Sequence, residues 1–293
     1  MPPKRKFQVS NGYLLEFDQL ARVLNFMAEN ASVKSIHRKE LQEYTGLADR
    51  QIESLVSVGS AMGLIQPRKQ TLGPVGTIIA KHDIFVEAKG TLEWCHYVGA
   101  GSYRNLIWYE VFNQLLPNGE SMTQEGWTEY LRNAFTGQYS NGTIRKHLYQ
   151  EVRFVVDAYL NRNFKKLELV NRTSDGRLYR RRYQTPDPLV FSAILYHYAE
   201  KNGTKLLQVM ELTEMPGSPG VLFAMDEATF RQVVEGLHEQ GWLRYEGTHN
   251  LDQLRLKEGH TALEFLRAYY EDREPRPEAK DISVRGQQRG RCD

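Results

Sequence analysis

The sequence predicts a mainly α-helical protein with small β-hairpins, an α+β fold. Two observations predict it. Apolar residues recur at helical spacings of three and four along several segments, and three such groups of helices are each followed by two short strand-like stretches. The chain has 293 residues, 41% of them hydrophobic, so two or three ordinary domains can each bury a core. Helices followed by a two-stranded hairpin are typical of the winged helix-turn-helix, and we predict tandem modules of that type.

The first predicted module covers residues 1–80. It contains the stretch "RKELQEYTGLADRQIESLVSVGSAMGLIQ", which indicates a short helix, a tight turn at Gly46, a longer helix and the start of a strand. Glycine suits that turn because it tolerates a positive φ. The segment 63–76 is rich in glycine and proline, and these residues fit a strand and a loop better than a helix.

The longer helix of this module offers a single basic residue near its start. Arg50 lies between Asp49 and Glu53 on the side that would face a DNA groove. Acidic side chains repel phosphates, so the module is either a weak DNA reader or a winged helix used for packing.

A helical connector is predicted over residues 81–120, with two buried helices broken at "GAGS" and ended by Pro117. A second module follows over residues 121–184, where "TIRKHLYQEVRFVVDAYL" predicts an amphipathic helix and "KLELVNRTSDGRLYRRRY" a hairpin with a Ser-Asp-Gly turn. The apolar face of that helix is formed by Ile144, Leu148, Val152, Val155 and Tyr159.

The third predicted module covers residues 185–274. It opens with the helix "LVFSAILYHYAEK", continues with a helix that Asp226 caps, and ends with strand, turn, strand and a closing helix. Residues 275–293 have almost no bulky apolar side chains and are predicted to be a disordered tail.

Charge is distributed unevenly along the chain, although the net charge is only +2. Residues 161–184 hold eight basic and two acidic side chains, and Lys4, Arg5 and Lys6 form a smaller basic cluster. Residues 204–246 hold three basic and seven acidic side chains. The central module is therefore the candidate for nucleic acid, and the acidic third module for a protein partner or a second copy of the chain.

The predicted DNA contacts lie on the second helix of the central module and on its hairpin. Arginine suits phosphate oxygens because its planar fork donates two hydrogen bonds. Alternatives for this surface are a solvated basic hairpin or one that docks on an acidic protein. The candidate residues are Arg145, Lys146, His147, Gln150, Arg153, Lys165, Lys166, Arg172, Arg177, Arg180, Arg181 and Arg182, with Arg50 of the first module.

The sequence contains no arrangement that predicts an active site, a metal site or a cofactor site. Cys95 and His96 are adjacent, but neighbouring helical residues point about 100° apart, and a cysteine between Trp94 and Tyr97 is typical of a core. The histidines show no metal-ligand spacing, and "GAGSY" follows a helix rather than a strand. We therefore predict a protein that is not an enzyme.

The expected compartment is the cytoplasm. The N-terminal stretch "MPPKRKFQVS" has no apolar signal core, and no run of about 18 apolar residues predicts a membrane span. The two cysteines, Cys95 and Cys292, are too few for a disulfide framework.

The run from about residue 37 to 160 resembles a prokaryotic family catalogued as domain of unknown function 4007. The similar pieces are "LADRQIESLVSVGSAMGLI" with "TLGPVGTII", "SYRNLIWYEVFNQ" and "YSNGTIRKHLYQEVRFVVDAYL". Where the family usually has a His-Glu-Thr-Phe stretch, this chain has "NGYLLEF". Members are often found near genes for DNA phosphorothioation or phage defence. The resemblance implies a helical, DNA-associated accessory protein and carries over no catalytic residues.

Together these observations predict a non-catalytic DNA-binding or adaptor protein of a prokaryotic phage-defence or DNA-modification system. Its expected partners are double-stranded DNA and other defence-system subunits, with a possible homodimer and no membrane. Three alternatives are a subunit that binds proteins only, an operon repressor, and a cryptic nuclease.

Overall fold

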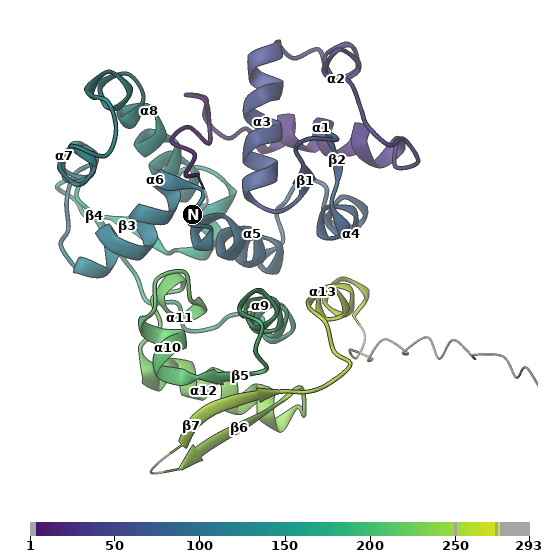
Figure 1. Cartoon of the computed structure of the whole chain (residues 1–293), viewed down its shortest axis with the longest axis vertical. Coiled ribbons are helices and arrows are strands. Elements are labelled where there is room, and N and C mark those ends of the chain that lie inside the picture. The colour runs from purple at the N-terminus through teal and green to yellow at the C-terminus, as the bar shows by residue number, and fades with distance from the viewer. Residues whose placement is uncertain (1–3, 249–250, 273–274, 276–293) are drawn as a thin grey trace, which may run out of the picture.

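The computed structural model describes residues 4–248, 251–272 and 275. Figure 1 shows three groups of elements around a central helix: α1–α4 with β1–β2 at upper right, α6–α8 with β3–β4 at upper left, and α9–α13 with β5–β7 below. The chain is mainly helical with small antiparallel sheets, which confirms the α+β prediction. The predicted tail falls outside the described residues, apart from Pro275.

The first group begins with a long amphipathic helix that buries its apolar side. Gly46 adopts a left-handed φ of 69° and ends α2, as the sequence predicts, and Gly63 does the same after α3 with a φ of 76°. The expectation of strand and loop over 63–76 is partly wrong: Pro74 occupies the first turn of a helix, where its missing N–H costs nothing. The elements are α1 (Phe17–Glu29), α2 (Arg38–Thr45), α3 (Asp49–Ala61), β1 (Ile65–Gln66), β2 (Thr71–Leu72) and α4 (Pro74–His82).

The second group follows the central helix and a break at residues 102–105. The central helix, α5 (Lys89–Gly101), is buried along most of its length. The helix after it continues into a π-helical turn and a 3₁₀ turn that contains Pro117. The elements of this group are α6 (Leu106–Glu110), the π turn Val111–Leu115, the 3₁₀ turn Leu116–Asn118, α7 (Gln124–Phe135), α8 (Asn141–Leu160), a 3₁₀ turn Asn163–Leu167, β3 (Val170–Arg172) and β4 (Leu178–Arg180).

The small sheet of this group has a third, single-residue strand. β3 pairs antiparallel with β4 in the register Asn171 opposite Tyr179, and Met122 forms a bridge to Leu178 on the other side of β4. The backbone groups of Met122 and Leu178 donate to each other at 3.2 and 2.7 Å. The order of elements is therefore helix, bridge, helix, helix, strand, strand.

The third group has a related but longer order: a helix, a strand, three helices, two longer strands and a closing helix. Asp187 caps α9 by accepting from the backbone N–H groups of Leu189 and Val190, and Asp226 caps α12, as predicted. The short segments β5, α10 and α11 were not predicted. β7 lies between β5 and β6, both antiparallel to it. The elements are α9 (Pro188–Asn202), β5 (Leu206–Gln208), α10 (Val209–Glu214), α11 (Pro219–Leu222), α12 (Glu227–Glu239), β6 (Leu243–Thr248), β7 (Leu251–Leu256) and α13 (Ala262–Glu271).

The groups share one core through α5. The fully buried His96 lies with its Nδ1 2.5 Å from the Tyr159 hydroxyl of α8, and its Nε2 3.0 Å from the carbonyl oxygen of Leu222 in α11. Tyr159 stacks on Phe164 with ring centroids 4.9 Å apart. The sequence suggested separate modules, but this aromatic centre joins the second and third groups directly.

Among the residues whose placement is described, no helix is both long and apolar enough to cross a membrane.

Candidate nucleic-acid interface

Helix α8 presents five of the predicted DNA-contacting residues, which we call the α8 face: Arg145, Lys146, His147, Gln150 and Arg153. Ser140 caps the helix by accepting from the backbone N–H of Thr143 at 3.1 Å. The predicted apolar residues, from Ile144 to Tyr159, are all buried on the opposite side. The amphipathic pattern therefore sends the charged side chains outward.

Three cations of the α8 face are exposed and unpaired. Arg145, Lys146 and Arg153 make no ion pair or hydrogen bond with any residue in the described ranges. Arg145 and Lys146 line a hollow of about 570 Å³ at the start of the helix, together with Ser140, Gly142 and Thr143. An exposed cation without a carboxylate partner keeps its full charge available to a phosphate.

The other two members of the face lie against the beginning of the chain. We call residues 4–16 the N-terminal arm. His147 is half-buried, and its Nδ1 lies 2.9 Å from Nε2 of Gln8 in the arm. Gln150 is half-buried beside Gly12, since a Cβ placed on that glycine would lie 4.0 Å from the Cβ of Gln150.

Arg50, on α3, is exposed, but its helix start carries acidic neighbours. Asp49 and Glu53 both lie near Arg38, at 3.4 and 3.9 Å from its Nη1. The positive charge of Arg38 therefore partly neutralises the two carboxylates that flank Arg50.

The arginines at the hairpin have partners of their own. Arg177 pairs with Asp175 at 3.2 Å, Arg181 with Glu168, and Arg182 with Asp226 of the third group at 2.6 Å. These pairs are solvent-exposed, so each contributes little to stability, yet each places a negative charge beside the guanidinium.

Arg180 corrects the predicted set, because its side chain points into the protein. Its Nη2 donates to the carbonyl oxygen of Val221, and its Nε is buried without a partner among the described residues. Burial lowers the pKa of Arg180 to about 10. Arg180 therefore cannot contact DNA without leaving its site.

Two of the remaining basic candidates, Lys165 and Lys166, lie between α8 and the hairpin, and the third, Arg172, lies at the end of β3. Lys165, Lys166 and Arg172 are exposed. The Lys166 ammonium donates to the carbonyl oxygen of Glu87 at 3.0 Å, whereas no ion pair or hydrogen bond of the Lys165 or Arg172 side chain occurs within the described ranges.

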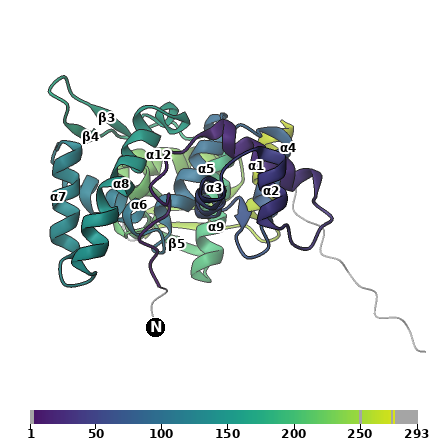
Figure 2. The same ribbon diagram turned by 90° about the horizontal axis from the view of Figure 1, so that it is seen from above.

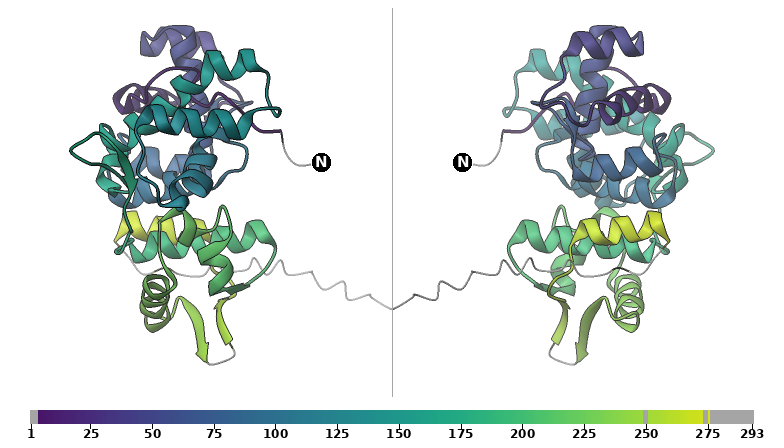
Figure 3. Two further views of the ribbon diagram at one scale, coloured as in Figure 1. Left: turned by 90° about the vertical axis from the view of Figure 1, so that its left-hand side faces the viewer. Right: turned by 90° about the vertical axis from the view of Figure 1, so that its right-hand side faces the viewer.

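The α8 face and the hairpin do not form one surface. Figures 2 and 3 show that the turn between α7 and α8 and the tip of the β3–β4 hairpin lie at opposite ends of this group. The sequence predicted that the helix and the hairpin grip DNA together. The structure instead separates an unpaired set from a paired set.

The residues that sequence reasoning missed come from the arm. Gln8 contacts the α8 face, and Lys4 and Lys6 precede it in the arm. The signal for them was a basic run followed by alternating apolar and polar residues in "KRKFQVS". Their position was not predictable, because Gln8 and His147 are 139 residues apart in the chain.

The buried titratable groups are structural. Burial lowers the pKa of His96 to about 3, and burial raises the pKa of Cys95, so neither is poised for acid–base or thiol chemistry. Burial also raises the pKa of Glu93 to about 7, against hydrogen bonds from the Tyr183 hydroxyl and the Asp187 N–H. No group of three or more His, Cys, Asp or Glu side chains suited to a metal ion occurs in the described part of the chain.

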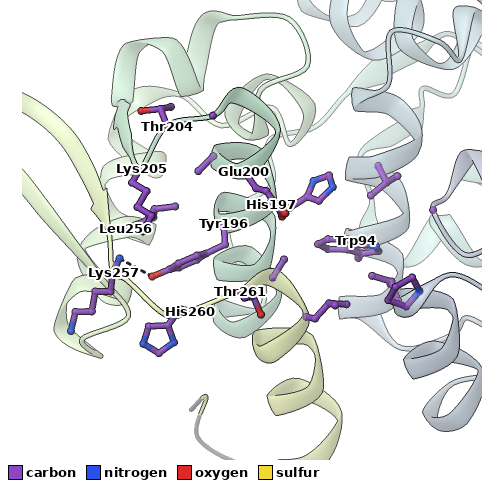
Figure 4. Close-up of a pocket in the computed structure, with 18 residues that line it drawn as sticks. Trp94, Tyr196, His197, Glu200, Thr204, Lys205, Leu256, Lys257, His260 and Thr261 are labelled. Atoms are coloured by element: carbon purple, nitrogen blue, oxygen red, sulfur yellow. Dashed lines mark hydrogen bonds between the residues drawn. The ribbon is translucent and has the colours of Figure 1, made fainter. Parts of the chain in front are cut away.

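A separate cleft of about 670 Å³ lies between α5 and the third group (Figure 4). Trp94 and Val98 line it from α5, and Tyr196 and His197 from α9. The hydroxyl of Tyr196 accepts from the backbone N–H of Lys257 at 3.0 Å. The Tyr196 hydroxyl also donates to the carbonyl oxygen of Trp242, so it holds the ends of neighbouring segments together. The described residues that line the cleft include no nucleophile hydrogen-bonded to a base.

Comparison with known proteins gives both a family and a fold. The model of the family described as "Protein of unknown function (DUF4007)" matches residues 52–270. This match begins later than the resemblance in the sequence and extends through the third group. No curated protein is similar to the chain.

Two crystal structures share the fold. One is magnesium ion-bound SspB, with a TM-score of 0.70 and 15% identity, covering 91% of this chain and 88% of that chain. The other is a second structure of SspB, with a TM-score of 0.69 and 14% identity over the same shares. Because the family model covers well over half of the sequence, the chain belongs to the DUF4007 family.

Proposed function

We propose that this protein is a non-catalytic DNA-binding or adaptor protein of a prokaryotic phage-defence or DNA-modification system, acting in the cytoplasm. It contacts duplex DNA through the α8 face. The observation that carries the proposal is the group of exposed, unpaired cations Arg145, Lys146 and Arg153 on one side of a capped helix.

The physical argument is electrostatic and geometric. An α-helix fits the major groove of B-DNA, and its N-terminal end carries a partial positive charge. Arginine and lysine near that end would reach base edges and the flanking phosphates, while His147 and Gln150 add polar donors and acceptors. The apolar side of α8 stays in the core, so binding needs no rearrangement of the helix.

We also propose that the second and third groups are winged helix-turn-helix modules. Both groups have a helix, then a strand or bridge, then further helices (two in the second group and three in the third) and then two strands. This order supports the proposal, as does the sheet order β5–β7–β6. In such modules the second helix of the motif enters the major groove. That helix is α8 in the central group.

The cellular setting is inferred from the family. The family resemblance implies a setting of DNA phosphorothioation or phage defence, and we extend that setting to this chain. The acidic third group, with exposed Met210 and Met215, is the side that we assign to a protein partner or a second copy.

Fluorescence anisotropy of a labelled duplex of about two helical turns tests the proposal. The wild type should bind, and Arg145→Ala/Lys146→Ala/Arg153→Ala should weaken binding by about a hundred-fold at moderate salt. A matched control, Lys201→Ala/Arg255→Ala/Lys257→Ala, removes the same charge from exposed positions of the third group and should bind almost as the wild type does. Absence of wild-type binding at low salt would refute the proposal.

The non-catalytic part needs its own test, because one structure with this fold, that of SspB, contains a magnesium ion. Supercoiled plasmid is incubated with the protein and Mg²⁺, and nicked or linear product is measured. The proposal expects intact plasmid, and protein-dependent nicking would overturn its non-catalytic part.

The second candidate is a structural subunit that binds proteins only. The paired hairpin arginines favour it, since their charge is already satisfied within the chain. Co-purification with a neighbour-encoded enzyme, combined with no binding to any duplex, would select this candidate. A third candidate, an operon repressor, would require a dimer and protection of the protein's own upstream region.

A further inference from the structure

The N-terminal arm has one side that packs and one side that is exposed. Its inward row is Arg5, Phe7 and Val9. Arg5 pairs with Glu110 at 2.6 Å and lies over the Tyr103 ring at 4.0 Å, and the Phe7 ring lies 5.2 Å from that of Tyr139. Val9 is buried. Alternation of this kind follows from extended backbone, and it leaves Lys4, Lys6 and Gln8 on the outward side.

The outward row of the arm runs beside the α8 face. Gln8 contacts His147, as described above. The backbone of Lys6 forms two hydrogen bonds with the segment before α6. Its N–H donates to the carbonyl oxygen of Arg104 at 2.7 Å, and its carbonyl oxygen accepts from the N–H of Leu106 at 3.1 Å. Arg104 is exposed and has no carboxylate partner within the described ranges. Gln8 therefore brings the arm against the α8 face, and Lys6 lies beside the exposed Arg104.

Glu151 of α8 holds the arm in this place. Its Oε2 accepts from the backbone N–H groups of Val9 and Ser10 at 2.9 and 3.0 Å, and its Oε1 accepts from the Ser10 hydroxyl at 2.8 Å. The arm turns around this carboxylate with left-handed residues Asn11 and Gly12, at φ 51° and 84°. Glu151 is 1% exposed, so its charge acts on the arm rather than on solvent.

The same turn of the arm is tied to α3. The hydroxyl of Ser54 donates to the carbonyl oxygen of Ser10 at 2.6 Å, and that of Ser57 to Val9 at 2.5 Å. The Lys6 ammonium donates to Ser57 as well, at 2.5 Å. The arm is thus a strap between α3 and α8, fixed at both sides.

We propose that the arm is a second DNA-contacting element, whose Lys4 and Lys6, with Arg104, bind backbone phosphates beside the groove that α8 enters, and that Glu151 is the positioning residue that holds it there. This inference rests on the proposed function and names a further part of the same interface. The ligand is the sugar–phosphate backbone of duplex DNA, recognised by charge rather than by sequence.

The first experiment removes the charges of the arm. Lys4→Ala/Lys6→Ala/Arg104→Ala should weaken duplex binding by about ten-fold and lower the slope of log K against log salt by about 2 to 3. The control is the third-group variant Lys201→Ala/Arg255→Ala/Lys257→Ala. All three substitutions are at exposed positions. Lys6→Ala also removes the hydrogen bond to Ser57, but the hydrogen bonds from the arm to Glu151 remain, so the fold is retained. Binding equal to that of the control would overturn the inference.

The second experiment tests Glu151 through the sign of its effect. Glu151→Gln removes a negative charge, so simple electrostatics predicts tighter DNA binding. Positioning predicts weaker binding, because a neutral amide has one acceptor oxygen in place of two charged ones, so it holds the donors of the arm less tightly. We expect a loss of about three- to ten-fold, of the size of the arm's contribution.

A double-mutant cycle separates positioning from a general loss of structure. In the background of Lys4→Ala/Lys6→Ala/Arg104→Ala, Glu151→Gln should have almost no further effect on binding, because the charges that it positions are gone. An additive loss would contradict the positioning role. If Glu151→Gln fails to fold, the arm-charge variant decides the inference alone.

The outcomes distinguish this inference from the proposed function. If the wild type does not bind duplex DNA, the proposed function fails. If the wild type binds and the α8 variant weakens binding while the arm variant does not, only the arm inference fails.

Discussion

Arg153 and Arg181 are exposed arginines of the same group, yet the structure surrounds them differently. Arg153, on α8, has no carboxylate partner within the described ranges, and it lines a hollow of about 330 Å³ with Gln51 and Gly12. Arg181, beyond β4, is paired with Glu168. The comparison extends to their neighbours, because Arg145 and Lys146 of the α8 face are unpaired, whereas Arg177 and Arg182 are paired and the Nε of Arg180 is buried. The difference teaches that the number of basic residues in a segment does not locate a binding surface. The surface is located by finding which of the charges lack a carboxylate partner.

The largest expected effect tests the difference between the α8 face and the hairpin directly. Arg145→Ala/Lys146→Ala/Arg153→Ala should weaken duplex binding by about a hundred-fold, whereas Arg177→Ala/Arg181→Ala/Arg182→Ala should weaken it by less than about ten-fold. Both variants lose three positive charges, so the difference reports position and pairing rather than net charge. Equal losses in an anisotropy titration would remove the distinction between the two regions.

The buried carboxyl group of Glu93 accepts hydrogen bonds from Tyr183 and Asp187, which follow the hairpin in the chain. This arrangement predicts that the free energy of unfolding depends on pH. The pKa of Glu93 is raised from 4.5 to about 7, so the folded protein keeps a proton that the unfolded chain releases between these values. The stability contribution is full at low pH and is lost as the pH rises through 7.

Urea unfolding at about pH 5 and about pH 8 measures this effect, with an expected loss of roughly 1–3 kcal/mol at the higher pH for the wild type. Glu93→Gln should reduce the difference, because its amide does not titrate. The α8 triple variant should keep the wild-type dependence. An unchanged pH dependence in Glu93→Gln would show that this carboxyl does not hold the segment.

A smaller effect tests whether the ion pairs of Arg177 and Arg181 keep these arginines from binding DNA. Glu168→Gln/Asp175→Asn removes the partners of Arg181 and Arg177 while it leaves both arginines in place. The freed guanidinium groups should then contact phosphates, and duplex affinity should rise by about two- to five-fold. The same pair of substitutions in the Arg177→Ala/Arg181→Ala background should give a smaller gain. No gain in the parent background would mean that the position of the hairpin, not its pairing, keeps it away from DNA.

The smallest effect is expected at Arg180. Arg180→Met removes a buried charge whose guanidinium contacts the carbonyl oxygen of Val221, and an apolar side chain of similar length fits a buried position. Duplex affinity should change by less than about two-fold, within the effect of one distant surface charge. A loss as large as that of Arg145→Met, measured in parallel, would place Arg180 at the interface after all.

The parts of the fold that follow from local pattern were predictable. The buried face of α8, the capping residue Asp226 and the hairpin turn at Gly176 all agree with the sequence signals, because helix period, cap chemistry and positive φ are local properties. α4 was missed because Pro74 was read as a breaker, although proline is well suited to the first turn of a helix.

The parts of the site that depend on distant neighbours were harder to predict. Period-two alternation places Arg180 on the same side as the buried Leu178, so its inward direction was a readable signal. The pairing of Arg182 with Asp226 and the arm beside His147 were not readable, because each joins residues far apart in the chain. The α8 residues of the predicted basic surface therefore belong to the candidate interface. The hairpin residues of that predicted surface lie at the other end of the second group.

The most direct test of the central claim is the salt dependence of duplex binding, measured for the wild type, the α8 triple variant and the hairpin triple variant from about 50 to 200 mM salt. The account predicts that the α8 variant lowers the slope of log K against log salt by about 2 to 3, while the hairpin variant lowers it by less than about 1. A slope that falls with the hairpin variant and not with the α8 variant would contradict it.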